Sequence, residues 1–265
     1  MINPKKSLGQ NFLIDKNVIE KILLNAKIKN NNVLEIGPGT GNLTSKILHK
    51  DPASIILIEK DKSLYANLKK NLSNPNNKIR FFNKDILDFD LENEIKEKTL
   101  IFGNLPYNIA SQILVKLIKF NKWPPKFNFL ALMFQKEVGD KIISRHGNKN
   151  YGRLSVLTNF RLKIIDHFNI SKNCFFPKPK VESKVIFFKP KINKKHYIRD
   201  IDNLEKITHI FFSSKRKMIN KAFKSIFKDH EKISKILKID QSKRPAQLTE
   251  DEYYAITVLY EQNLN

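Results

Sequence analysis

The stretch from Asn32 to Gly41 constrains the fold more than any other part of the chain. Asn32–Ile36 is apolar enough to be a buried strand, and Gly37, Gly39 and Gly41 follow it directly. Glycines permit positive φ and let a ligand approach the backbone closely, and apolar residues at helical spacing come next. The pattern predicts a strand, a tight turn and a helix whose first N–H groups are free to face a ligand.

Strand-like and helix-like stretches alternate along the first part of the chain. Further strand-like runs lie at Ser54–Ile58, Ile79–Phe82, Leu100–Phe102, Phe129–Leu132, Leu154–Leu157 and Val185–Phe188. A helical pattern runs from Ile109 to about Phe120. Alternation at this spacing predicts an α/β fold with a doubly wound, mostly parallel sheet. From about residue 191 only helical periodicity remains, so we expect a domain of residues 1–190 and a small all-helical domain of residues 191–265.

Charge is the first functional clue. The 265 residues carry a formal net charge of +23, and a compact fold with that charge repels itself, which favours a polyanionic partner such as nucleic acid. A lysine-rich composition set by an AT-rich genome is the alternative. Residues 215–244 contain 11 Lys and Arg against 3 Asp and Glu. A basic helix face there predicts RNA contacts, with a solvated surface as the alternative. The predicted contacts are Lys215, Arg216, Lys217, Lys221 and Lys224.

Several classes of protein are disfavoured. No apolar run is long enough to span a membrane, and the first six residues lack the apolar core of a secretion signal. The single cysteine, Cys174, excludes an intrachain disulfide and a cysteine-cluster metal site, and the six histidines show no metal-ligand spacing. We therefore expect a cytoplasmic protein without a bound metal.

Two carboxylates extend the glycine-rich turn into a predicted cofactor site. Glu59 ends the second strand, where an acid can accept hydrogen bonds from two ribose hydroxyls, and Asp85 follows the third, where it can bind an adenine amine. The carboxyl ends of neighbouring strands in an open α/β sheet meet at one crevice, so we expect Gly37, Glu59 and Asp85 to lie together. A dinucleotide site shares the first two elements and remains the alternative.

The run Gly103–Tyr107 follows the fourth strand and belongs at the same crevice. It matches the Asn-Pro-Pro-Tyr type of motif of amino methyltransferases. An adenine N6 amine is a poor nucleophile, and acceptors from Asn104 and from a backbone carbonyl near Leu105 or Pro106 can hold both of its hydrogens. Tyr107 offers a ring on which an extruded base can stack. Catalysis would then come mainly from orientation and proximity. A turn that merely ends a strand is the alternative.

With these motifs in place, the whole chain resembles one family. From residue 6 to about 255 it is similar to the KsgA family, the small-subunit rRNA adenine-N6,N6-dimethyltransferases. The matching motifs are Lys6–Asp15, Glu35–Gly41, Gly103–Tyr107, Gln135–Val138, Tyr151–Ser155, Phe175–Ser183, Ser214–Lys217 and Arg244–Pro245. The resemblance implies a Rossmann-like class I methyltransferase fold with S-adenosylmethionine as the cofactor.

The resemblance also implies roles for individual residues. The expected cofactor contacts are Asn11, Leu13, Glu35, Gly37, Gly39, Glu59, Asp85, Ile86 and Asn104. The target base is expected to stack between Tyr107 and Phe175, with Asn104, Leu105 and Pro106 beside it.

The expected product is a pair of neighbouring dimethyladenosines near the 3′ end of small-subunit rRNA. The substrate is expected to be an immature or undermethylated small subunit, and the enzyme a monomer. Two alternatives stay open. One is the sister family that dimethylates large-subunit rRNA and confers macrolide resistance, against which the start Leu8–Gln10 and Arg244–Pro245 argue. The other is a non-catalytic rRNA-binding assembly factor.

Overall fold

The chain folds into two compact units in a computed structural model, which describes residues 4–5, 8–74 and 78–263. One unit comprises Met1–Gly139 and Ile164–Pro190, and the other Asp140–Lys163 and Lys191–Asn265. One boundary between the two units falls after Pro190. Residues 140–163 group with the C-terminal helices, whereas the sequence analysis assigned them to the first domain.

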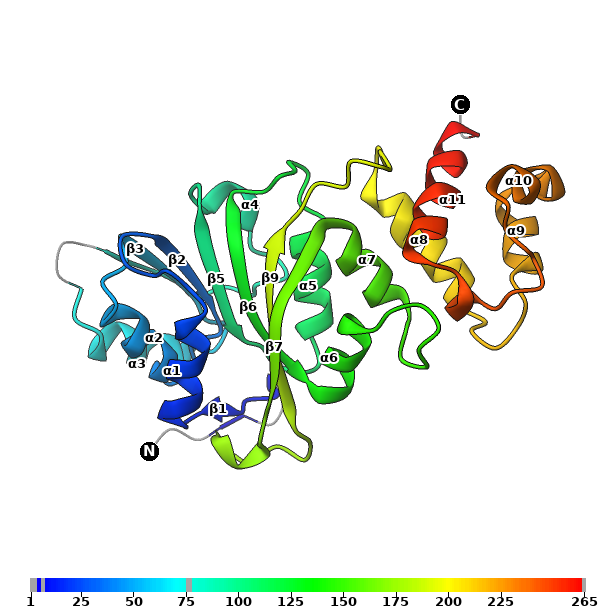
Figure 1. Cartoon of the computed structure of the whole chain (residues 1–265). Helices are drawn as coiled ribbons and strands as arrows, with labels where there is room; N and C mark the ends of the chain where they lie inside the picture. Colours follow the sequence, from blue (N-terminus) through cyan, green and yellow to red (C-terminus); the bar gives the residue numbers. More distant parts are fainter. Residues whose placement is uncertain (1–3, 6–7, 75–77, 264–265) are drawn as a thin grey trace. The chain divides into compact units, whose positions relative to one another are not determined.

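The first unit is built on a seven-stranded sheet with the order β4-β3-β2-β5-β6-β9-β7 (Figure 1). Its strands are β2 (Asn32–Ile36), β3 (Ser54–Ile58), β4 (Ile79–Phe82), β5 (Thr99–Asn104), β6 (Phe127–Gln135), β7 (Leu162–Ile170) and β9 (Ser183–Pro190). Strands β2 to β6 pair in parallel, and β9 pairs antiparallel with β6. The predicted mostly parallel sheet is confirmed.

The helices of this region alternate with the strands. They are α1 (Lys16–Leu24), α2 (Asn42–Leu48), α3 (Lys62–Asn71), α4 (Leu91–Glu94), α5 (Ala110–Ile118) and α6 (Lys136–Ile143). A separate two-stranded antiparallel sheet joins β1 (Phe12–Leu13) to β8 (Phe175–Phe176). The short turn η3 (Lys172–Cys174) precedes β8.

Both faces of the large sheet are covered, which explains the unbroken apolar runs in the sequence. Successive residues of a strand point to opposite faces, and the neighbours Val33 and Leu34 are both buried. Val33 belongs to a core cluster that also contains Ile19 of α1 and Ile47 of α2. Strands buried on both sides need apolar residues at every position, as parallel strands commonly do.

The second unit is all helical in its C-terminal part, as predicted. It contains α7 (Arg153–Arg161), α8 (Ile201–Phe212), α9 (Asn220–Ile226), α10 (His230–Leu237), the short turn η4 (Pro245–Gln247) and α11 (Glu250–Gln262). The Tyr254 hydroxyl of α11 donates to the Val156 carbonyl of α7, and Tyr253 packs edge-on against Phe211 of α8.

One predicted element is wrong in type. Leu154–Leu157 was expected to be a strand but lies within helix α7, where every residue from Ser155 to Phe160 is buried. Because both its apolar and its polar residues are buried, this helix shows no alternation between an apolar and a polar face, and periodicity could not separate it from a buried strand. Within the described part of the chain, no helix is long and apolar enough to cross a membrane.

Candidate active site

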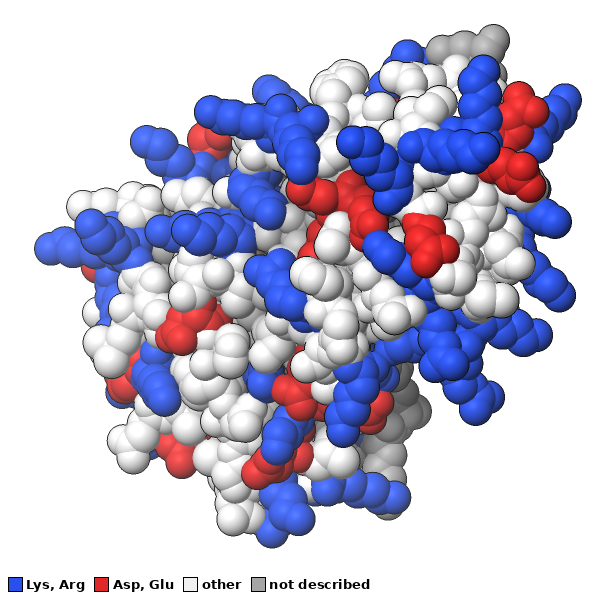
Figure 2. Space-filling model, turned by 45° about the vertical axis from the view of Figure 1, so that its right-hand side comes forward, with Lys and Arg blue, Asp and Glu red and all other residues white. Residues whose placement is uncertain are grey.

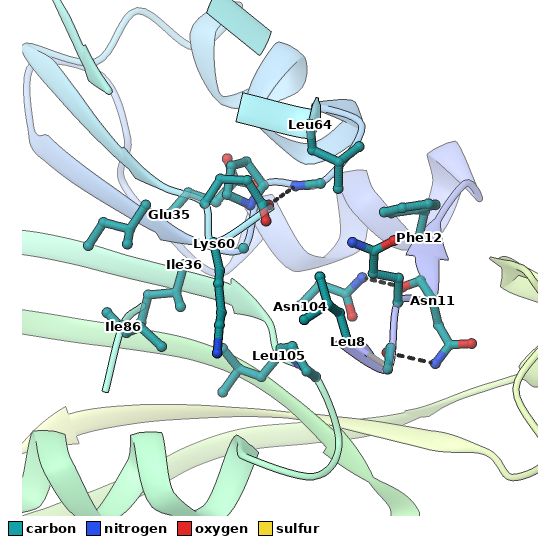
Figure 3. A pocket seen from close by; sticks show the side chains of 18 of the residues that line it. Leu8, Asn11, Phe12, Glu35, Ile36, Lys60, Leu64, Ile86, Asn104 and Leu105 are labelled. Carbon is teal, nitrogen blue, oxygen red and sulfur yellow. Dashed lines mark hydrogen bonds between the residues drawn. The ribbon is translucent and has the colours of Figure 1, made fainter. Parts of the chain in front are cut away.

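A cavity lies at the carboxyl ends of β2, β3 and β5, where the sequence analysis placed the crevice (Figure 3). Most of its lining comes from residues 8–13, 35–40, 58–60, 84–86 and 104–109. These segments are far apart in the sequence, and the parallel order of the strands brings them together. Every predicted cofactor residue lines this cavity, as do Leu105, Pro106 and Tyr107.

The glycine-rich turn forms one wall because of its backbone conformation. Gly37, Gly39 and Gly41 have φ of +67°, +58° and +85°, in the left-handed region that favours glycine. At Gly39 a Cβ atom would also lie 2.8 Å from the ring of Phe12. The turn therefore presents bare backbone to the cavity, as a closely bound ligand requires.

Glu59 is held in place from both sides of its carboxylate. One oxygen accepts a hydrogen bond from the Gly39 N–H at 3.1 Å and the other accepts from the Asp61 N–H at 2.9 Å. The side chain is buried, and burial raises the pKa of Glu59 despite these hydrogen bonds. Each oxygen retains acceptor capacity for a further donor, which suits a pair of ribose hydroxyls.

Glu35 is a second buried carboxyl on the cavity wall. It is 2% exposed and accepts a hydrogen bond of 2.7 Å from the Thr44 hydroxyl. Burial raises the pKa of Glu35 to about 8, and the charge of Glu59 adds to the effect. Glu35 is therefore mainly protonated at neutral pH, and a cationic ligand in the cavity would favour its charged form.

Asp85 has an ammonium partner that the sequence analysis did not identify. It forms a 2.5 Å ion pair with Lys60 and accepts a 2.9 Å hydrogen bond from the Leu87 N–H. Although partial burial acts in the opposite direction, these contacts lower the pKa of Asp85. Its neighbour Ile86 is buried and gives the cavity an apolar surface.

Asn104 ends β5 with its amide group oriented by the N-terminal segment. Its Nδ2 donates to the Asn11 carbonyl at 2.9 Å (Figure 3). With the donor end of the amide engaged, Oδ1 is the end available to accept from a ligand. Tyr107 is half-buried, and its hydroxyl lies 2.6 Å from the Ser183 hydroxyl. The Gly103–Tyr107 segment thus places an amide acceptor and a ring at one cavity.

Further polar contacts fix the N-terminal segment across the cavity. Gln10 and Lys5 contact the same Asp61 oxygen at 3.1 and 2.9 Å, and Asn42 donates to the Leu13 carbonyl at 2.8 Å. Although burial alone would raise the pKa of Asp61, hydrogen bonds that include those from Lys5 and Gln10 lower it. Neither Asp61 nor its two partners, Lys5 and Gln10, were predicted as part of the site, although the partners lie beside and within the Lys6–Asp15 motif. Lys6 and Ser7 of that motif lie outside the described residues.

Phe175 does not lie where the sequence analysis expected it. Its ring is 3% exposed, belongs to the same core cluster as Leu13, and is not part of the cavity lining. The register of the small sheet pairs Phe175 with Leu13 and Phe176 with Phe12. The expected stacking of a base on Phe175 would require that ring to leave the core. The exposed aromatic side chain of β8 is Phe176, at 58%.

The predicted RNA-binding residues of the second unit divide into two groups. Arg216, Lys217, Lys221 and Lys224 are exposed. The Lys215 ammonium instead donates to the Lys149 and Tyr151 carbonyls, at 2.7 Å each. Figure 2 shows Lys and Arg side chains spread over much of one face, with Asp and Glu in smaller groups. No group of His, Cys, Asp and Glu suited to a metal ion occurs among the described residues.

Comparison with known proteins covers both units. A family model described as ribosomal RNA adenine dimethylase matches residues 1–262. The chain is 44% identical to the ribosomal RNA small subunit methyltransferase A of Pelagibacter ubique, over 98% of each chain. The crystal structure of a dimethyladenosine transferase from Plasmodium falciparum matches with a TM-score of 0.75 and 26% identity, over 96% of this chain and 98% of that one. The 23S rRNA methyltransferase ErmE matches with a TM-score of 0.68 at 21% identity, over 95% of this chain and all of that one.

Proposed function

Because the chain belongs to the ribosomal RNA adenine dimethylase family, we propose that it methylates the N6 amines of two neighbouring adenosines in small-subunit rRNA, with S-adenosylmethionine as the donor. The substrate is an undermethylated small subunit, and the enzyme acts as a monomer. The small-subunit relative shares 44% of its residues with this chain. The large-subunit enzyme shares 21%, a likeness that speaks for the fold alone. The small subunit is therefore the favoured substrate over the large one.

The cavity wall fits the proposed cofactor in chemistry as well as in shape. The bare backbone at Gly37 and Gly39 accommodates a closely held ligand, and the fixed carboxylate of Glu59 suits the ribose hydroxyls. Asp85 lines the same cavity and would accept a hydrogen bond from the adenine amine. Glu35 is a buried acid whose ionisation a positive charge would favour. When bound, S-adenosylmethionine supplies a methyl group on a cationic sulfur, which matches that preference.

The single observation that carries the proposal is the orientation of Asn104. Its Nδ2 is engaged by the Asn11 carbonyl, so Oδ1 is left to accept a hydrogen bond from the target amine. A backbone carbonyl near Leu105 or Pro106 would take the second hydrogen, and the nitrogen lone pair would then point toward the methyl group. Tyr107 would hold the extruded base by stacking.

No general base is needed in this scheme. Methyl transfer would leave the positive charge on the N6 nitrogen, and this cation is far more acidic than the free amine and loses its proton to solvent. The protein's contribution is therefore to hold the amine in a reactive geometry, which matters more in the transition state than in binding.

The test of the substrate is methyl transfer from labelled S-adenosylmethionine into purified subunits. Undermethylated small subunits should accept label, whereas fully methylated small subunits and large subunits should not. Label in large subunits alone would overturn the proposal in favour of the sister activity. Sedimentation at the mass of one chain, 31.0 kDa, tests the monomer, and a mass of two chains would contradict it.

A further inference from the structure

Residues 176–181, here called the rim segment, join the small sheet to β9, and both ends of the segment are anchored beside the cavity. At one end, Phe176 is paired with Phe12, which lines the cavity. Residues directly opposite each other in an antiparallel pair share a face of the sheet, so Phe176 lies on the same face of the small sheet as Phe12. At the other end, Ser183 contacts the hydroxyl of Tyr107 at 2.6 Å.

Most side chains of the rim segment are exposed, and only its two prolines are covered. Phe176, Lys178, Lys180 and Val181 are exposed, whereas Pro177 is half-buried and Pro179 is buried. The segment therefore presents one aromatic ring, two ammonium groups and one small apolar side chain to solvent. Neither lysine ammonium makes an ion pair or a side-chain hydrogen bond within the described residues. The glutamate that follows, Glu182, pairs with Lys136 at 3.0 Å.

An exposed ring followed by unpaired lysines is the combination that binds single-stranded nucleic acid. Aromatic rings stack on bases without regard to sequence, and lysines contact the phosphates. An apolar partner surface would leave the two lysines without a role, so charge favours RNA over a protein. The site also has a steric reason to hold RNA, because the nucleotides flanking an extruded base must pass the mouth of the cavity.

We propose that the rim segment binds the RNA strand next to the target adenosine, with Phe176 stacked on a flanking base and Lys178 and Lys180 on phosphates. The inference rests on the proposed function and deepens it. It assigns substrate positioning to residues outside the cavity lining. Since two neighbouring adenosines are modified, the flanking base during one transfer is the target base of another.

The test uses the full chain and undermethylated small subunits in single-turnover methyl transfer. Phe176→Ala should raise the protein concentration for half-maximal rate by about 5- to 150-fold, the range expected for loss of one stacked base. Phe176→Trp should stay close to the wild type and Phe176→Leu should behave like Phe176→Ala. Wild-type behaviour of Phe176→Leu would mean an apolar protein contact and would overturn the stacking role.

The lysines are tested through salt dependence. Lys178→Ala with Lys180→Ala should flatten the slope of log affinity against log salt by about 1.4, at about 0.7 for each single-strand phosphate contact. The matched control is Lys27→Ala with Lys96→Ala. These exposed lysines precede β2 and β5, so they lie at the amino ends of the strands, whereas the cavity lies at the carboxyl ends. Leu24→Ala, at a side chain 79% exposed on α1, is the control for loss of an exposed apolar group.

The outcomes separate the two proposals. If the wild type transfers no methyl group to small subunits, the proposed function fails. If the wild type is active and the rim variants match it in half-maximal concentration and salt slope, only the rim proposal fails. S-adenosylmethionine affinity, measured by calorimetry, should be the same in all variants and shows that each one folds.

Discussion

The cavity of the first unit and the basic surface of the second hold their charged groups in opposite ways. In the cavity, Glu35 and Glu59 are buried and each carboxyl has a fixed donor at 2.7–3.1 Å. On the second unit, Arg216, Lys217 and Lys221 are exposed. A group that reacts or binds one ligand needs fixed geometry, whereas phosphate attraction depends mainly on the number of charges. A single substitution in the cavity should therefore change stability, rate or cofactor affinity strongly. A single substitution on the basic surface should change RNA affinity only slightly, and several together should be needed for a clear effect.

The largest effect should come from the buried carboxyl of Glu35. The pKa of Glu35 is raised from 4.5 to about 8, so its stabilising protonated form is fully present below pH 4.5 and is lost as the pH rises through about 8. Without cofactor, the free energy of unfolding should fall over this window by up to roughly 5 kcal/mol, at about 1.4 kcal/mol per pKa unit. Glu35→Gln should lack this fall, because glutamine does not titrate and can still accept from Thr44. Denaturant unfolding between pH 5 and 8.5 measures the difference, and parallel curves for the two proteins would contradict it.

The second effect in size concerns the reacting amine. Asn104→Ala should lower the single-turnover rate by about 10²–10³, or about 2.7–4 kcal/mol, by analogy with the loss of one polar contact at other reacting centres. Subunit affinity should change little, because the contact matters most in the transition state. Asn42→Ala is the control for a loosened N-terminal segment. It removes the hydrogen bond to the Leu13 carbonyl of that segment and leaves the Asn104 amide intact. A folded Asn104→Ala protein with wild-type rate would remove Asn104 from the mechanism.

The third effect concerns the cofactor alone. Glu59→Ala should weaken S-adenosylmethionine binding by about 1–3 kcal/mol, the range for lost hydrogen bonds to a charged group. Calorimetry measures the cofactor affinity, with Asp51→Ala as the control. Asp51 is an exposed acid that precedes β3, so it lies at the amino ends of the strands, away from the cavity. Unchanged affinity in a folded Glu59→Ala protein would take Glu59 out of the site. Binding of NAD in place of S-adenosylmethionine would contradict the methyltransferase assignment.

The smallest effects per residue should come from the basic surface. Each single alanine variant at Arg216, Lys217, Lys221 or Lys224 should weaken subunit binding slightly. The fourfold variant should flatten the salt dependence of subunit binding. Cofactor affinity should stay the same. Lys215→Ala should behave differently and lower stability, since its ammonium holds two backbone carbonyls. A salt slope that does not change in the fourfold variant would reassign these residues to a solvated surface.

The parts of the molecule that the sequence predicted are those encoded by local patterns. The apolar run Asn32–Ile36 and the glycines after it specify strand and turn directly, and parallel topology then brings Glu59 and Asp85 to the same edge. The helix α7 was misassigned because complete burial removes helical periodicity. Strand β7 gave no signal, because most of its residues are exposed at the edge of the sheet.

The missed parts of the site depend on contacts between distant segments. Nothing local in the sequence indicates that Asp61 is the anchor of Gln10, or that the Asn11 carbonyl orients Asn104. The same holds for Phe175 and Phe176, which pair with Leu13 and Phe12 and of which only Phe176 is exposed. A pattern can place an aromatic residue near a site, but which ring faces the site is decided by register.

The central claim is that this cavity directs a methyl group to the N6 amine of adenosine. The most direct test is nucleoside mass spectrometry of small-subunit rRNA after incubation of undermethylated subunits with the protein and S-adenosylmethionine. The account predicts N6,N6-dimethyladenosine at two neighbouring positions with the wild type, and its near absence over the same time with Asn104→Ala. Methyl groups found on ribose, on a ring nitrogen or on another base, or the dimethylated product in equal yield with Asn104→Ala, would contradict it.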